Sequence, residues 1–283
     1  MKIISIVANN PTFIELQYKT VQKFVVGGDY EYIVFNDGKD FPDPTNFGNI
    51  EEGRAGIVKK CADLNIHCIN IPNAHHIRNI DASLRHSDSL NFVLKYMKSN
   101  LDEYLMLDSD MFLIDHLDLN VYRKHICACV LQERPGLVYF WPNLFYLDMR
   151  RAPNIDKLGL GLIPRGDTGS ASSIWLKTFN YKYPSSKTIN SSDDIQLCNS
   201  DFYMIKHLYS LSWDESRLPV NIGKNIIELL KADNRNVNGK YFYEIYDNRI
   251  LHYRAGTNWM NQNKELHDEN ISKLVEYVTK VVS

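Results

Sequence analysis

The sequence has 283 residues, of which 44% are hydrophobic and 23% charged, with a formal net charge of −2. This length accommodates one large α/β domain or two small ones, with a substantial core in either case. The near-neutral charge argues against a nucleic-acid partner, and against a nuclease in particular, because both need a basic track along the phosphate backbone.

The N-terminal segment and the cysteines bear on the compartment. Residues 1–10 carry one basic residue and a short apolar run that ends at two asparagines, which predicts a first strand and not a signal peptide. No later stretch approaches the roughly twenty apolar residues of a membrane-spanning helix. The five cysteines contain no C-x-x-C pair and fit a reducing compartment. We therefore expect a cytoplasmic protein without an integral membrane segment, a reading that leaves peripheral attachment open.

The N-terminal half predicts alternating strands and helices. Strands are expected at 2–7, 31–35 and 67–71, and helices around 14–25, 54–64 and 81–101. This order favours a parallel sheet whose ligands gather beyond the carboxyl ends of its strands. Asn9, Asn10 and Asp37 follow two such strands, where they can bind a base or ribose or simply cap turns. His75 and His76 lack the i, i+4 spacing of helical metal ligands and are expected on a loop surface.

Residues 103–114, Glu-Tyr-Leu-Met-Leu-Asp-Ser-Asp-Met-Phe-Leu-Ile, place an acidic triplet inside an apolar run. We interpret the run as a buried strand that ends in two carboxylates. Side chains two apart in an extended chain project to the same side, so Asp108 and Asp110 can converge on one hard divalent cation. The alternative is a solvated turn. The apolar flanks argue against it, because ionised groups are costly there without a counter-charge.

The C-terminal half predicts further strands, helices and acidic segments. A strand is expected at 126–131, two strand pieces around Pro142 within 137–149, and loop at 152–173. Helices are expected at 221–233, at the C-terminus, and in a stretch containing Phe202, Ile205 and Leu208. Asp167 lies between two glycines, which lets the backbone pass close to a ligand. Asp193 and Asp194 precede a helical pattern, so one of them can be a helix cap.

A second informative segment is Ile250–Trp259. His252 ends an apolar run, and neutral imidazole can be a third ligand for Mn2+, although a lone histidine is more often structural. Arg254 can neutralise phosphate, and Gly256 leaves room for a diphosphate against the backbone.

Two segments carry a family resemblance. Leu-Asp-Ser-Asp-Met-Phe-Leu resembles the DXD segment of GT-A-fold glycosyltransferases, and residues 250–259 partly resemble the H-x-x-G-x-x-K-P-W segment of some retaining GT-A families. Here the glycine comes one position later and the Lys-Pro pair is missing, which leaves retaining or inverting chemistry open. The resemblance implies a Rossmann-like GT-A fold with a mixed, mostly parallel sheet. It also implies Mn2+ or Mg2+ on a nucleotide-sugar diphosphate, held by Asp108, Asp110 and His252.

The same resemblance implies roles for individual residues. The nucleotide-sugar site would comprise Ala8, Asn9, Asn10, Asp37, Arg85, Asp108, Ser109, Arg254, Gly256 and Asn258. Trp259 would contact the acceptor, and the general base of an inverting enzyme would be one of Asp167, Asp193 and Asp194. Residues 1–115 would bind the nucleotide-sugar and residues 116–283 the acceptor, the latter with a C-terminal metal and phosphate segment, as halves of one GT-A domain.

The expected activity is transfer of a hexosyl or pentosyl group from a UDP-sugar, or secondarily a GDP-sugar, to a glycan or other hydroxyl acceptor. A sugar nucleotidyltransferase is an alternative, but residues 8–12 lack the Gly-rich, Arg-containing loop that such enzymes usually carry after the first strand. A non-catalytic carbohydrate-binding module is the other alternative, and it would bind free glycan without nucleotide or metal.

Overall fold

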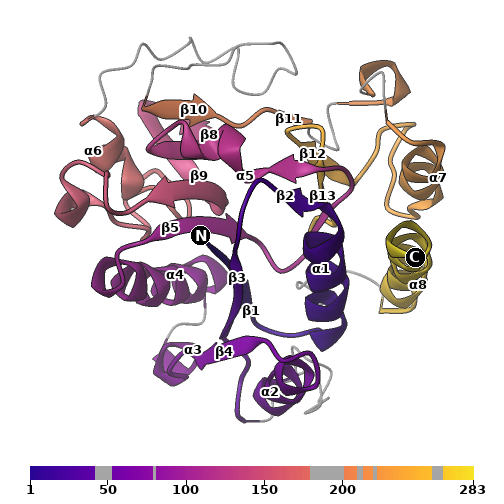
Figure 1. Cartoon of the computed structure of the whole chain (residues 1–283), viewed down its shortest axis with the longest axis horizontal. Helices are drawn as coiled ribbons and strands as arrows, with labels where there is room; N and C mark the ends of the chain where they lie inside the picture. The colour runs from indigo at the N-terminus through magenta and orange to yellow at the C-terminus, as the bar shows by residue number, and fades with distance from the viewer. Residues whose placement is uncertain (42–52, 79–80, 179–200, 209–212, 219–221, 257–263) are drawn as a thin grey trace.

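A seven-stranded sheet forms the centre of the protein (Figure 1). The computed structural model describes residues 1–41, 53–78, 81–178, 201–208, 213–218, 222–256 and 264–283. The strand order is β10-β8-β9-β5-β1-β3-β4. In chain order these strands are β1 (Lys2–Val7), β3 (Glu31–Asn36), β4 (His67–Asn70), β5 (Glu103–Leu107), β8 (Cys127–Arg134), β9 (Leu137–Asp148) and β10 (Phe202–Met204). Only β9 runs antiparallel to its neighbours, so the predicted α/β class with a mixed, mostly parallel sheet is confirmed.

A second, antiparallel sheet lies beside the first. Its order is β11-β12-β13-β6, formed by β6 (Met111–Leu113), β11 (His207–Leu208), β12 (Glu244–Tyr246) and β13 (Ile250–His252). A short parallel pair joins β2 (Val25–Val26) to β7 (Leu117–Asp118). The chain passes from the large sheet to the small one between β5 and β6, through residues 108–110.

Helices cover both faces of the large sheet. The helices in the described residues are α1 (Pro11–Phe24), α2 (Arg54–Asp63), α3 (Ala74–Arg78), α4 (Ala82–Ser99), α5 (Leu119–Arg123), α6 (Ser172–Leu176), α7 (Lys224–Ala232) and α8 (Lys264–Val282), with 3-10 turns η3 (Ile155–Lys157) and η6 (Glu215–Arg217). Helices α7 and α8 pack with the small sheet instead. Successive side chains of β1 point to opposite faces of the large sheet. Ile3 packs in a cluster with α1 and α2 on one face, whereas Ile4 packs in a cluster with α4 and α6 on the other. Among the described residues, no helix has the length and apolar character needed to cross a membrane.

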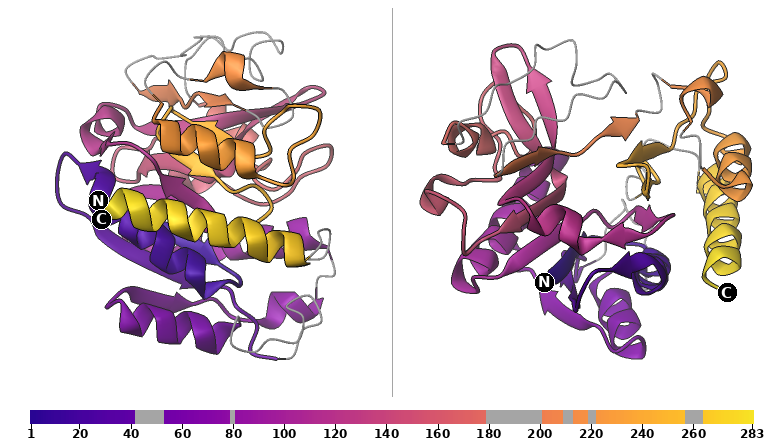
Figure 2. Two further views of the ribbon diagram at one scale, coloured as in Figure 1. Left: turned by 90° about the vertical axis from the view of Figure 1, so that its right-hand side faces the viewer. Right: turned by 45° about the horizontal axis from the view of Figure 1, so that its top comes forward.

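A third apolar cluster holds the small sheet in place. Phe13 and Leu16 of α1 pack there with β12, β13, α7 and α8, while Ile14 of the same helix faces the large sheet. Helix α8 packs against α1 and α7, and Figure 2 shows it extending alongside them. Helix α1 therefore couples the two sheets.

Three sequence predictions about elements were wrong. Strand β9 is continuous, because Pro142 lies at an irregularity in the β8–β9 pairing, where no regular ladder bond is lost. The stretch around Phe202 forms β10 and β11 and not a helix, because apolar runs this short have no distinct periodicity. Residues 152–173 are not all loop, since they contain η3 and the start of α6.

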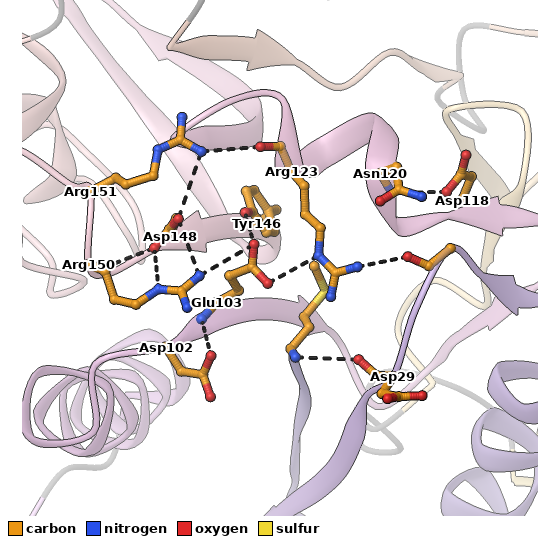
Figure 3. A network of polar contacts seen from close by, with 12 residues as sticks. Asp29, Asp102, Glu103, Asp118, Asn120, Arg123, Tyr146, Asp148, Arg150 and Arg151 are labelled. Carbon is orange, nitrogen blue, oxygen red and sulfur yellow. Dashed lines mark hydrogen bonds and ion pairs between the residues drawn. The ribbon is translucent and has the colours of Figure 1, made fainter.

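A network of ion pairs lies at the N-terminal end of β5 (Figure 3). The Glu103 carboxylate forms ion pairs with the guanidinium groups of Arg123 at 3.1 Å and Arg150 at 3.5 Å. The Tyr146 hydroxyl donates a hydrogen bond to the same carboxylate at 3.1 Å. Arg150 also pairs with Asp148 at 3.1 Å. The acidic and basic side chains at this end of β5 are thus paired with one another. The acidic residues Asp108 and Asp110 lie beyond the opposite end of β5.

Candidate metal and nucleotide site

Asp108, Ser109 and Asp110 form a tight turn directly after β5. The Met111 amide donates to the Asp108 carbonyl at 3.0 Å, and the chain then enters β6. The expectation of an extended chain at this point was therefore wrong. The turn is nevertheless not a solvated one, because Ser109 and Asp110 are buried and Asp108 is half-buried. Its carboxylates remain inside the protein, between the two sheets.

Gln17 of α1 holds both ends of this turn. Its side-chain amide donates to the carbonyls of Asp108 at 2.6 Å and Met111 at 2.7 Å. Its oxygen accepts from the Tyr32 hydroxyl at 2.6 Å. Asn143 of β9 adds a hydrogen bond from its side-chain amide to Asp108 Oδ2. These contacts orient the turn, and the sequence offered no signal for them because the partners are distant along the chain.

His252 reaches the turn from β13. Its Nε2 lies 3.1 Å from Asp110 Oδ1, and ligand atoms of Asp108, Asp110 and His252 all lie within 4.8 Å of one another. The strand register produces this meeting, since His252 is paired with Met111, the residue that follows Asp110. The structure thus brings together the three residues predicted to bind a metal.

Glu244 orients the imidazole of His252. The two residues are direct cross-strand partners in β12 and β13, and Glu244 Oε2 lies 2.7 Å from His252 Nδ1. Because a carboxylate only accepts, Nδ1–H donates to Glu244, and Nε2 of the same ring faces Asp110. Tyr246 donates a second hydrogen bond to Glu244 Oε2 at 2.8 Å. A carboxylate behind a histidine is the usual support of a metal ligand, and Glu244 was not predicted from the sequence.

The electrostatics of the cluster follow from burial and proximity. Burial acts to lower the pKa of His252, but Asp110 and Glu244 outweigh it and raise that pKa to about 10. Burial and the neighbouring Asp110 raise the pKa of Asp108 to about 7. Without a cation the His252 imidazole is therefore protonated on both nitrogens. A divalent ion can replace the proton on Nε2, the nitrogen that faces Asp110.

The residues present fit a divalent cation. Asp110 Oδ1 is buried, and its close contacts among the described residues are His252 Nε2, 3.1 Å away, and the neighbouring Asp108 carboxylate. Two carboxylates and one imidazole form the mixed oxygen and nitrogen set that suits Mn2+, and the carboxylates also suit Mg2+. Two neighbouring carboxylates that share one imidazole leave oxygen lone pairs that a bound cation would satisfy.

The segment after His252 is pressed onto Asp110. The Gly256 amide donates to Asp110 Oδ2 at 2.9 Å, and the Tyr253 amide donates to the Asp110 carbonyl at 2.8 Å. A Cβ at Gly256 would lie 2.7 Å from the Phe13 ring and 2.9 Å from the Asp110 Cβ. The glycine is therefore needed for this packing. Arg254 is partly exposed, with its Nε 3.8 Å from Glu244.

The candidate nucleoside residues lie at the ends of β1 and β3. Asn9 and Asn10 are buried and Ala8 is half-buried, directly after β1. Asn10 adopts a left-handed φ of 55° at the start of α1, and its side-chain Nδ2 has no hydrogen-bond partner within the described part of the chain. Asn10 thus combines a turn role with a side-chain donor that the described residues leave unsatisfied.

Asp37, the candidate after β3, is already engaged by protein groups. His75 and His76 lie beside its Oδ1 at 2.9 and 3.2 Å, and Ser89 donates to its Oδ2 at 2.7 Å. Burial acts to raise the pKa of Asp37, but its contacts with the two histidines lower it to about 2. The expectation that His75 and His76 lie on a loop surface was wrong: they belong to α3, and their side chains are only 5% and 4% exposed.

The remaining candidates are dispersed. Arg85 is half-buried in the first turns of α4, close enough to Lys39 that it helps burial to lower the Lys39 pKa. Asp167 is about half exposed on a turn, with Arg134 3.8 Å away. Asp193, Asp194, Asn258 and Trp259 lie outside the described residues.

His86 of α4 is influenced by the charge of Asp110, although the sequence did not single it out. Burial lowers its pKa, while the charges of Asp37, Asp167 and Asp110 act on it in the opposite direction. Its ring therefore lies among carboxylates from three separate segments. Its position one turn into α4 is the only sequence signal, and that signal is weak.

Known proteins offer limited comparison. No protein-family model matches the sequence, and neither does any curated protein sequence. Among solved structures, the chain is similar to the galactosyltransferase LgtC in complex with donor and acceptor sugar analogues, and to an active-site mutant of LgtC. Both are 17% identical with a TM-score of 0.36, and the matches cover 56% of this chain and 62% and 61% of theirs. The match thus spans less than two thirds of those chains, and likeness at this level carries no conclusion on activity.

Proposed function

We propose that the protein is a metal-dependent glycosyltransferase of the GT-A type. It would transfer a sugar from a nucleoside diphosphate sugar, with UDP favoured over GDP, to a glycan or other hydroxyl acceptor. The observation that carries the proposal is the meeting of Asp108, Asp110 and His252, whose ligand atoms all lie within 4.8 Å of one another. The meeting point lies at the carboxyl end of β5, where ligands gather in sheets of this kind.

The DXD resemblance and this geometry support each other. The motif alone is a weak signal, since two aspartates two residues apart occur by chance. Here its carboxylates are buried, the turn is held by Gln17, and a histidine with its own supporting carboxylate faces it. A merely structural turn requires none of these features.

Each residue then has a role. Asp108, Asp110 and His252 would hold Mn2+ or Mg2+, which when bound supplies charge neutralisation to the departing nucleoside diphosphate. Glu244 keeps the His252 ring in the tautomer whose Nε2 faces the site. Asn9 and Asn10 would bind the nucleoside, and Arg254 would approach phosphate. A carboxylate that activates the acceptor hydroxyl is required only for inversion.

The test is thermal unfolding with UDP and GDP separately, each with and without Mn2+. A ligand at a hundred times its dissociation constant stabilises the folded state by about 2.7 kcal/mol, which is readily measured. We expect a Mn2+-dependent shift with UDP that is lost in Asp110→Ala. The matched control is Asp63→Ala, which removes an exposed carboxylate at the end of α2 and should leave the shift unchanged.

Turnover separates the enzyme from a binding module. A panel of UDP-hexoses and UDP-pentoses with Mn2+ should yield free UDP for at least one donor, and Asp110→Ala should abolish that release. The proposal would be rejected if neither UDP nor GDP shifted unfolding with Mn2+. Binding of free glycan without nucleotide or metal would instead support the carbohydrate-binding alternative.

A further inference from the structure

We propose a second metal site, formed by Asp37, His75 and His76, for a divalent transition-metal ion of the Zn2+ type. The Nε2 atoms of His75 and His76 lie 2.9 and 3.2 Å from the same oxygen, Asp37 Oδ1. Ligand atoms bound tetrahedrally to Zn2+ at its usual bond lengths are about 3.4 Å apart. An ion can therefore be accommodated with shifts of a few tenths of an ångström.

Two of the three ligands, His75 and Asp37, are oriented from behind. His75 Nδ1 donates to the Pro72 carbonyl at 2.8 Å, which leaves Nε2 directed at the carboxylate. The second oxygen of Asp37 accepts from the Ser89 hydroxyl of α4 at 2.7 Å. Metal-binding histidines and carboxylates typically have such partners on the side away from the ion. Two imidazoles with one carboxylate also favour Zn2+ and its neighbours over Mg2+.

The electron pairs at the centre of the cluster need a cation or protons. Because the Pro72 carbonyl accepts a hydrogen bond from His75 Nδ1–H, a neutral His75 ring has its lone pair on Nε2, which faces Asp37 Oδ1. His76 Nε2 faces two further acceptors, Asp37 Oδ1 and the Asp37 carbonyl, the latter at 2.8 Å. In the metal-free protein, N–H groups of the two rings can donate to these oxygens; a divalent ion would replace those protons and take both Nε2 atoms and Asp37 Oδ1 as ligands.

This site is separate from the candidate catalytic cluster and does not depend on the proposed function. None of its three ligands belongs to the Asp108, Asp110 and His252 group. Its ligands come from the end of β3 and from α3, so the ion would fasten the segment between β4 and α4 to the sheet. Lys39, Arg85 and Asp88 lie around it, and their charges of both signs leave the local field mixed.

The experiment uses Co2+ as the probe, with the Asp110→Ala protein, so that the first cluster lacks a ligand. We expect one Co2+ per chain, with the visible absorption of a four-coordinate ion. Adding His75→Gln should weaken binding by about a hundredfold or more, because a ligand and not merely its support is lost. Adding His67→Gln is the matched control, since that histidine is exposed on β4, and it should change nothing.

X-ray absorption of Zn2+ in the Asp110→Ala protein gives a measurement that needs no change in the site itself. Scattering from two imidazoles per ion is expected, whereas the other cluster could supply only one. Three results would each overturn the proposal: scattering from a single imidazole per ion, no ion retained by the protein, or a Co2+ spectrum that His75→Gln does not change. Asp37, His75 and His76 would then form a hydrogen-bonded cluster only.

Discussion

Mn2+ binding at Asp108, Asp110 and His252 should weaken steeply as the pH falls from 8 to 6. His252 is protonated in the metal-free protein, because its pKa is raised to about 10. Each bound ion must displace that proton, which costs about tenfold in affinity per pH unit. Asp108, with a pKa of about 7, begins to hold a second proton in the same interval.

The two titrations together set the magnitude. With these pKa values the fraction of protein free of both protons falls about a thousandfold between pH 8 and pH 6. That change corresponds to about 4 kcal/mol of binding free energy. The direction is fixed by the raised pKa values: acid favours the protonated, metal-free form, and base favours the bound form.

The assay counts free Mn2+ by its electron paramagnetic resonance signal, in a His75→Gln background so that only one of the two clusters can bind. In His252→Gln the dependence should fall to about tenfold or somewhat more, because only Asp108 still titrates and its pKa is no longer lowered by the His252 charge. His67→Gln should retain the full dependence. An affinity that changes by less than about tenfold from pH 8 to pH 6 would refute the assignment of these protons.

Three substitutions test the surroundings of the site. Glu244→Gln should weaken Mn2+ binding by about 10- to 100-fold, once each affinity is corrected for the His252 proton that the ion displaces, because the support of His252 is weakened. Unchanged corrected affinity in the same Mn2+ assay would contradict this role. Gly256→Ala should cost about 1–3 kcal/mol of unfolding free energy in urea through overpacking, whereas Gly223→Ala, where a Cβ meets nothing within 4 Å, should cost less. Arg235→Ala should cost about 3–5 kcal/mol of unfolding free energy, because the buried Asp233 carboxylate loses its ion-pair partner. Adding Asp233→Ala should recover part of that loss. Additive losses in the double variant would argue against a coupled ion pair.

Much of the fold was predictable because its elements are long and strongly patterned. Helix α4 shows a continuous apolar stripe and an Asp81 cap that accepts from the Ser83 amide at 2.8 Å. The errors fall on short elements such as β10, where three residues cannot show a period. In β9 the proline was expected to break a strand that in fact runs on with an irregular ladder.

The candidate site was predictable only where its residues are close in sequence. Asp108 and Asp110 share one motif, but Glu244 enters through the pairing of β12 with β13. That hairpin had a readable signal in Asp247 and Asn248, whose φ angles of 50° and 59° are those that Asp and Asn tolerate in tight turns. The burial of His75 depends on contacts with Asp37 and Ser89, which no local pattern encodes.

The cross-strand pairing of His252 with Met111 and Glu244 makes the ligand set sensitive to insertions. Successive side chains of a strand face opposite sides, so one extra residue in the β12–β13 turn would direct Leu251 toward the carboxylates and His252 toward the apolar cluster around α8. Lengthening a surface loop elsewhere would cost little by comparison. Relatives of this protein should therefore vary freely in loop length while the spacing from Glu244 to His252 stays constant.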